Sequence, residues 1–122
     1  MSDFSLLDLF KIEVENQLTL FTESLLELEK QGASVSNLEA LMRAGHSIKG
    51  AARLVGVKPA ERLAHVLEDA FSAAQVGTIK ITANDIDAFL LAADMLKHIS
   101  LQPEGQADVF VANNKAQFDD LL

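Results

Sequence analysis

The chain has 122 residues, a length sufficient for one domain with its own hydrophobic core. Hydrophobic residues make up 49% of it and the formal net charge at pH 7 is −8, which excludes a disordered tail and argues against nucleic-acid binding through a general basic surface. The sequence contains no cysteine, so disulfide bonds, thiolate nucleophiles and cysteine-ligated zinc are excluded as well.

The first predicted element is a long amphipathic helix over residues 4–30. Its apolar residues, from Leu7 to Leu28, recur at alternating steps of three and four positions. This spacing is typical of a helix that buries one face against a core. Gly32 and the polar residues around it are expected to end the helix.

Two further helices are predicted between residues 36 and 77. Ser36 and Glu39 have the spacing of a capping box, which predicts a helix that begins at Ser36. Gly56 is expected to end that helix, and Pro59 suits the first turn of the next one, where its missing N–H is harmless. Gly77 is expected to close the third helix.

A fourth helix is predicted after Thr82, which has Asp85 three residues later as a capping partner. The sequence QPEG at 102–105 breaks it. Helices joined by such short turns are expected to form an all-α, antiparallel, up-down-up-down four-helix bundle. We expect this bundle to occupy residues 1–101, and residues 102–122 to form a fifth helix or the start of an interdomain linker.

Basic residues are unevenly distributed. Half of them fall within residues 43–62, where there is a single acid, Glu61, and the local charge is +4. The five basic residues of this segment are Arg43, Lys49, Arg53, Lys58 and Arg62. Such clustering suggests a bound anion or an acidic partner, with Arg43, Arg53 and Arg62 as docking residues; the alternative is an ordinary solvated helix face.

His46, Lys49 and Gly50 share one face of the second predicted helix, because their spacings are i, i+3 and i, i+4. Helical side chains lean toward the N-terminus, so a side chain at position 50 would cover His46. Glycine costs about 1 kcal/mol relative to alanine inside a helix. We interpret Gly50 as a residue that keeps His46 accessible; the alternative is a glycine that permits close helix packing.

The third helix is expected to bring a carboxylate to this histidine. If the helical hairpin turns near residue 57, His46 and Glu68 each lie about eleven residues from the turn, at similar height, with His65 about one turn nearer the loop. A carboxylate that accepts a hydrogen bond from one imidazole nitrogen leaves the other free as a nucleophile. Lys49 would neutralise an incoming phosphoryl group.

The sequence HSIKGAA, which begins at His46, resembles the phosphoacceptor motif of histidine-containing phosphotransfer (HPt) domains, in particular the N-terminal domain of CheA-type chemotaxis kinases. The resemblance continues in order and spacing through ERLAHVLEDAFSAAQVGTIKIT. It implies that His46 is the phosphorylated histidine and that Lys49 positions the phosphoryl group. Gly50 then opens the site, Glu68 orients the imidazole, and His65 is a second histidine in the same hydrogen-bonded site.

The segment AARLVGV departs from the glycine-rich form found in many chemotaxis kinases and is closer to hybrid CheA-like kinases that also carry a receiver. The resemblance implies a phosphorelay module and not a complete enzyme. A separate kinase domain, which holds ATP and Mg²⁺, would phosphorylate His46, and the phosphoryl group would pass to an aspartate of a response-regulator receiver. This domain itself would need no cofactor or metal.

The resemblance and the composition together predict a cytoplasmic, monomeric module with protein partners and without nucleic-acid or membrane binding. The sequence has neither an apolar run of the roughly 20 residues that a membrane span needs nor a basic signal-peptide start. Two other functions stay open at this point. One is a metal site formed by His46, His65 and Glu68, which the neighbouring Lys49 disfavours. The other is a helical adaptor in which the histidine is incidental.

Overall fold

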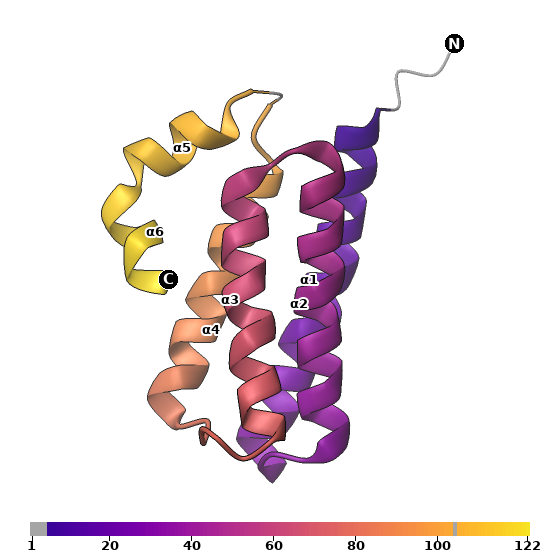
Figure 1. Cartoon of the computed structure of the whole chain (residues 1–122), viewed down its shortest axis with the longest axis vertical. Coiled ribbons are helices and arrows are strands. Elements are labelled where there is room, and N and C mark those ends of the chain that lie inside the picture. Colours follow the sequence, from indigo (N-terminus) through magenta and orange to yellow (C-terminus); the bar gives the residue numbers. More distant parts are fainter. Residues whose placement is uncertain (1–4, 104) are drawn as a thin grey trace.

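A computed structural model describes residues 5–103 and 105–122, and in this part of the chain every regular element is a helix. The helices are α1 (Leu6–Gln31), α2 (Val35–Val55), α3 (Lys58–Gln75), α4 (Ala83–Ser100), α5 (Ala107–Asn113) and α6 (Lys115–Leu121). The first four run antiparallel to their neighbours in the chain, as Figure 1 shows. The predicted four-helix bundle is therefore confirmed.

The helix termini follow local capping chemistry. Ser5 caps α1, so the helix begins at Leu6; the predicted start at residue 4 lies outside the described residues. The predicted capping box of Thr82 and Asp85 at the start of α4 is confirmed. Pro59 lies in the first turn of α3, as expected, and Gly56 ends α2 in the left-handed conformation, at φ 76°.

The predicted start of α2 is wrong. The capping residue is Ser34 and not Ser36, and its partner three residues later is Asn37 and not Glu39. The side chain of Ser34 accepts from the backbone N–H of Asn37, whose Oδ1 accepts in return from the N–H of Ser34. Asn37 also donates to the carbonyl of Gly32, so a buried amide joins the loop to the helix and fixes the earlier start.

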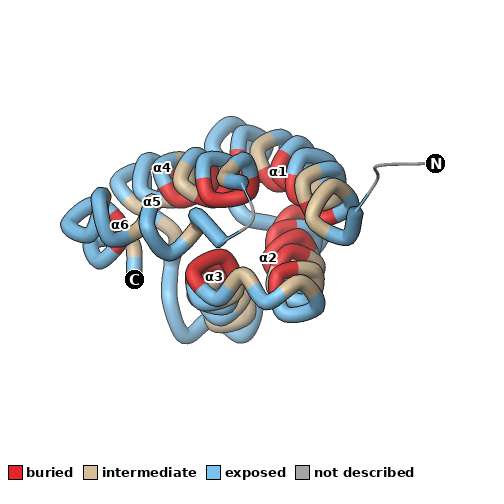
Figure 2. Tube along the Cα trace, turned by 90° about the horizontal axis from the view of Figure 1, so that it is seen from above, coloured by how far each residue is buried: buried red, intermediate tan, exposed pale blue. Residues whose placement is uncertain are grey.

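The core lies between the facing sides of α1 to α4, where Figure 2 shows the buried residues turned toward one another. Aromatic rings connect the helices at its centre. Phe21 of α1 meets Phe71 of α3 edge to face with ring centroids 5.7 Å apart, and Phe89 of α4 lies 4.6 Å from Phe71. Burial of apolar surface at about 25 cal/mol per Å² is the main stabilising contribution in such a bundle.

The C-terminal segment, for which a fifth helix or the start of a linker was expected, forms two short helices. Asn114 ends α5 and begins α6, and its side chain donates to the carbonyl of Phe110. This hydrogen bond competes with continuation of the helix and allows the chain to turn. The two helices lie beside α3 and α4 (Figure 1), and Phe118 of α6 is only 1% exposed.

Candidate functional site

The site lies beside a close backbone contact between α2 and α3. A Cβ atom at Gly45 would lie 3.1 Å from the backbone nitrogen of Glu68 and 3.3 Å from the carbonyl oxygen of Ala64. The absence of a side chain at Gly45 therefore lets the two backbones come together at Glu68. This contact brings the side chain of Glu68 within reach of residues on α2.

His46 and Lys49 of α2 both contact the carboxylate of Glu68. The Nδ1 atom of His46 lies 2.5 Å from Oε2, and the Nζ atom of Lys49 donates to Oε1. The predicted meeting of His46 and Glu68 across the hairpin is therefore confirmed. The side chain of His46 is 67% exposed, whereas those of Glu68 and Lys49 are 16% and 15% exposed.

The electrostatics of this triad keep Glu68 ionised. Burial would raise the pKa of the Glu68 carboxyl, but the hydrogen bonds from Lys49 and from His46, with the charges of both groups, outweigh it. The pKa therefore lies below the ordinary value of 4.5. At neutral pH the carboxylate is an acceptor only, so the Nδ1 atom of His46 must carry the proton and donate it.

This arrangement determines which imidazole nitrogen is reactive. Since Nδ1 of His46 is protonated and donates to Glu68, a neutral ring has its lone pair on Nε2. The large exposed fraction of the side chain leaves that nitrogen accessible. The geometry thus provides a nucleophile held in one tautomer by a carboxylate, with an ammonium group one helical turn away.

Gly50 and Gly45 have different surroundings. A Cβ atom at Gly50 would meet no atom within 4 Å, so Gly50 does not serve helix packing. The alternative of a packing glycine applies to Gly45 instead, which the sequence analysis did not single out. The sequence did contain an indication of this packing role, because Gly45 lies on the inward-facing side of α2 and Ala64 opposite it is also small.

His65 lies about one turn nearer the loop than Glu68, as expected, but it pairs with a residue other than Glu68. Its Nε2 atom lies 3.0 Å from Oδ2 of Asp69 on the same helix, and both side chains point to solvent. In the described residues the hydrogen bonds of Glu68 go to His46 and Lys49, so His65 is not part of that network. The local i, i+4 pairing, which needs no ordering of another helix, turns the ring toward Asp69. Asp69 was missed in the sequence.

The structure does not bring together all three members of the metal site that the sequence left open, because His46 and Glu68 meet whereas His65 pairs with Asp69. That site required His46, His65 and Glu68 to converge. Within residues 5–103 and 105–122, no group of three or more histidine and carboxylate side chains is arranged to hold a metal ion.

The predicted docking arginines each have a local partner. Arg43 pairs with Glu39 at 2.8 Å within α2, and the Nε atom of Arg53 donates to Glu61 of α3 at 2.8 Å. The guanidinium of Arg62 lies 5.6 Å from the ring centroid of Phe118. The basic segment is thus spread over two helices and is not one continuous patch around His46.

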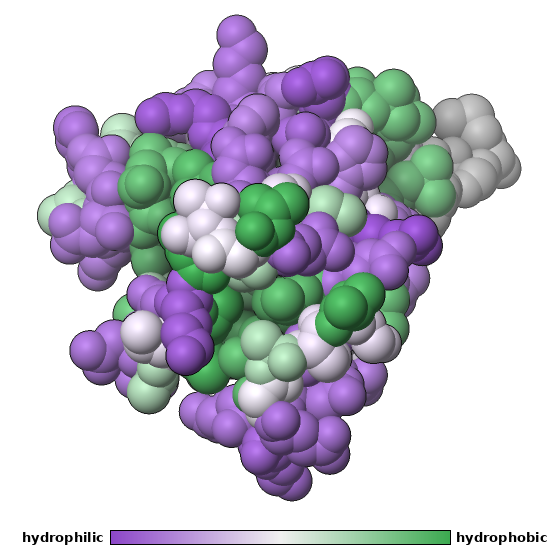
Figure 3. All heavy atoms as spheres, turned by 60° about the horizontal axis from the view of Figure 1, so that its bottom comes forward, coloured by the Kyte–Doolittle hydropathy of each residue, from purple (hydrophilic) through white to green (hydrophobic). Residues whose placement is uncertain are grey.

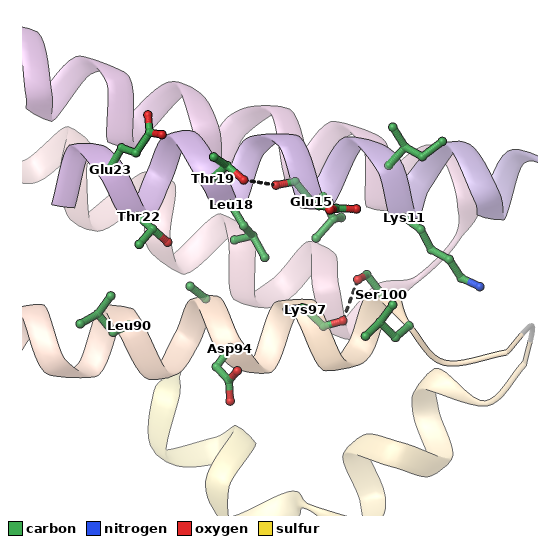
Figure 4. Close-up of a pocket in the computed structure, with 14 residues that line it drawn as sticks. Lys11, Glu15, Leu18, Thr19, Thr22, Glu23, Leu90, Asp94, Lys97 and Ser100 are labelled. Atoms are coloured by element: carbon green, nitrogen blue, oxygen red, sulfur yellow. Dashed lines mark hydrogen bonds between the residues drawn. The ribbon is translucent and has the colours of Figure 1, made fainter. Parts of the chain in front are cut away.

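Two larger hollows lie apart from His46. One, of about 630 Å³, lies between α1 and α4, where the hydroxyls of Thr19 and Ser100 donate to backbone carbonyls of their own helices (Figure 4). The other, of about 610 Å³, opens at the end of the bundle, where apolar side chains such as Leu38 and Ile81 gather (Figure 3). Neither hollow is lined by a histidine, so the imidazole–carboxylate pair of His46 and Glu68 lies outside both.

Comparisons with known proteins cover the part of the chain that contains this site. The family model described as the Hpt domain matches residues 5–100, which include α1 to α4 and the whole His46 site. No helix among the described residues has the length and apolar character that crossing a membrane requires.

Curated relatives include chemotaxis proteins and a sensor histidine kinase. The chain is 33% identical over 88 residues to the sensor histidine kinase CheAY of Helicobacter pylori. The matched region covers 72% of this chain and 11% of that protein. The chain is 31% identical over 91 residues to the chemotaxis protein CheA of Bacillus subtilis. That matched region covers 75% of this chain and 14% of the Bacillus protein. The chain therefore spans only a small part of the length of these relatives.

A solved structure shows the same fold. It is the phosphorylated P1 domain of CheA3 in complex with CheY6 from R. sphaeroides, with a TM-score of 0.78. The match covers 95% of this chain and 91% of that one, at 23% sequence identity.

Proposed function

Since the chain belongs to the Hpt domain family, we propose that His46 accepts a phosphoryl group and passes it to a protein partner. The observation that carries this proposal is the contact between Nδ1 of His46 and the ionised Glu68, which leaves an exposed Nε2 as the nucleophile. Membership of this family makes the chain a phosphotransfer module of a type found in CheA-like kinases. The residue roles are our proposal.

The bonding changes follow from this geometry. The lone pair on Nε2 of His46 attacks the γ-phosphorus of ATP, the N–P bond forms, and the bond to the bridging oxygen breaks, which releases ADP. The ring keeps its proton on Nδ1 and gains positive charge as the bond forms. Glu68, already ionised, stabilises that charge without a proton transfer.

Lys49 is placed to act on the phosphoryl group itself. Its ammonium lies one helical turn from His46 and is held by Glu68 in the free protein. Once a phosphoryl group is on Nε2, its oxygens offer Lys49 a second anionic partner. Lys49 then acts as a point charge that stabilises the transferring group.

Gly50 completes the proposed site by keeping space open beside His46. No atom lies within 4 Å of the position that its Cβ would take. Phosphoryl transfer needs the attacking Nε2 atom of His46 and the leaving oxygen to lie in line with the phosphorus, so steric access is a requirement of the reaction.

The partners are inferred from chemistry and from the relatives. A CheA-type kinase catalytic domain, which binds ATP and Mg²⁺, would supply the phosphoryl group. The solved P1 domain is described in complex with CheY6, which supports a response-regulator receiver as the acceptor. We therefore propose that the chain is the phosphotransfer part of a longer cytoplasmic histidine kinase, with residues 1–101 as the Hpt domain and 102–122 as an extension of it.

The test is a phosphorylation assay on the full 122-residue chain with a CheA-type kinase catalytic domain and radiolabelled Mg-ATP. We expect an acid-labile, base-stable label on the wild type and no label on His46→Gln. His98→Gln is the matched control, because His98 is exposed near the end of α4 and contacts Phe110 instead of the site. Label that persists in His46→Gln would contradict the assignment of His46, and a wild-type chain that takes up no label would favour an adaptor role.

A further inference from the structure

His65 of α3 lies between two carboxylates of its own helix. Glu68 and Asp69 follow it by three and four residues, the two spacings at which helical side chains meet. Successive residues are about 100° apart around a helix axis, so the two carboxylates lie on either side of His65. Glu68 reaches across to α2, whereas Asp69 points to solvent. A neutral imidazole has a single N–H, so it can donate to only one of them.

In the structure the ring of His65 takes Asp69. Its Nε2 atom lies 3.0 Å from Oδ2 of Asp69, and the two side chains are 53% and 67% exposed. A carboxylate can only accept a hydrogen bond, so Nε2 carries the proton and donates it. The one N–H of the neutral ring is then used, and Glu68 receives no hydrogen bond from His65.

Both oxygens of Glu68 already serve residues of α2. Oε2 lies 2.5 Å from Nδ1 of His46, and Oε1 accepts from Nζ of Lys49. The Glu68 side chain is only 16% exposed, so it has little room to change position without losing one of these contacts. A further donor from α3 would share an oxygen with one of them and draw the carboxylate away from α2. The hydrogen bond that selects the tautomer of His46 would then be weaker.

We propose that Asp69 is a positioning residue for the reaction at His46, because it holds His65 away from Glu68. Asp69 contacts neither the reacting imidazole nor the phosphoryl group. It acts through His65 and Glu68, and it leaves the Glu68 carboxylate to His46 and Lys49. The inference rests on the proposed function and gives a role to a residue that the sequence analysis did not single out.

The experiment compares variants of the full chain in phosphorylation by a CheA-type kinase catalytic domain with radiolabelled Mg-ATP. An i, i+4 pair on an exposed helix face is weak, so we expect Asp69→Ala to lower the initial rate by about two- to threefold. Asp69→Glu should keep the wild-type rate, because a glutamate four residues after His65 can still hold the ring. His65→Ala combined with Asp69→Ala should restore the rate, because the competing ring is gone.

A second measurement separates this role from a merely structural one. NMR of the ¹⁵N-labelled imidazole of His46 gives the fraction of neutral ring that carries its proton on Nδ1. We expect that fraction to fall in Asp69→Ala and to return in the double variant. Asp94→Ala is the matched control, because it removes the same charge from the middle of α4, beside the α1–α4 hollow, and should leave both measurements unchanged.

Two results would overturn the inference. One is an unchanged rate and tautomer in Asp69→Ala; the other is a defect that persists when His65 is also removed, since Asp69 would then act by another route. Either result leaves the proposed function intact as long as wild-type His46 takes up label. A wild-type chain that takes up no label would overturn both.

Discussion

Gly45 and Glu68 are in backbone contact: a Cβ atom at position 45 would lie 3.1 Å from the Glu68 nitrogen, closer than packed atoms normally approach. The residue that immediately precedes the proposed nucleophile therefore determines how near α3 lies to α2. Because Glu68 reaches His46 with an Nδ1–Oε2 distance of 2.5 Å, a small change in helix separation alters the support of the imidazole directly.

The two glycines of α2 should respond differently to alanine. Alanine is favoured over glycine in a helix by about 1 kcal/mol. At Gly50 the new methyl group enters open space, so Gly50→Ala should stabilise the fold by about 0.5–1 kcal/mol. At Gly45 the methyl group would press on the α3 backbone, so Gly45→Ala should be less stable than Gly50→Ala by about 1 kcal/mol or more. Urea denaturation measures both; equal stabilities would contradict the packing role of Gly45.

A larger side chain at Gly50 tests access to the nucleophile. Leucine at this position should lean back along α2 and cover His46, so Gly50→Leu should reduce the rate of phosphorylation by at least about tenfold, equivalent to roughly 1.4 kcal/mol of activation free energy. The measurement is the initial rate of label uptake at saturating kinase, compared with Gly50→Ala. Equal rates for the alanine and leucine variants would refute the steric role.

Removal of the charge at Glu68 should slow the reaction without abolishing it. Glutamine keeps the shape of the side chain but cannot offer a carboxylate, so the ring loses both its fixed tautomer and the counter-charge to the forming N–P bond. We expect Glu68→Gln to lower the rate of phosphorylation of His46 by about 10- to 1000-fold. Wild-type rates in this variant would exclude Glu68 as the group that orients the imidazole.

The lowered pKa of Glu68 predicts a specific dependence of stability on pH. A carboxyl whose folded-state pKa lies below 4.5 stabilises the fold above that value, and the contribution is lost as the pH falls through the lower, folded-state value. Urea unfolding at about pH 6 and about pH 3 should therefore show a smaller loss of stability for Glu68→Gln than for wild type. The same loss in both proteins would show that Glu68 does not make this contribution.

Periodicity and hairpin geometry were sufficient to predict the part of the site that depends on regular helices. The apolar faces of α1 to α4 determine the bundle. His46 and Glu68 are equally far in sequence from the α2–α3 turn, so they lie at the same level along the two helix axes. The helix rise per residue is nearly constant, so counting residues along two antiparallel helices gives a reliable juxtaposition.

The features that could not be predicted depend on competition between nearly equivalent local partners. Ser34 and Ser36 both have a polar residue three positions later, and the buried hydrogen bond of Asn37 to Gly32 decides between them. His65 is placed to approach Glu68 or Asp69, and it takes Asp69. Sequence spacing permits each of these partners and does not show which hydrogen bond forms.

The central claim, that Glu68 holds Nδ1 of His46 and leaves Nε2 to react, is tested most directly by NMR of the ¹⁵N-labelled imidazole. In the free protein we expect the neutral form of the ring to carry its proton on Nδ1, and after phosphorylation we expect a phosphorus coupled to Nε2. In Glu68→Gln the preference for this tautomer should weaken. A phosphoryl group on Nδ1 of His46, or an unphosphorylated ring with its proton on Nε2, would contradict the account.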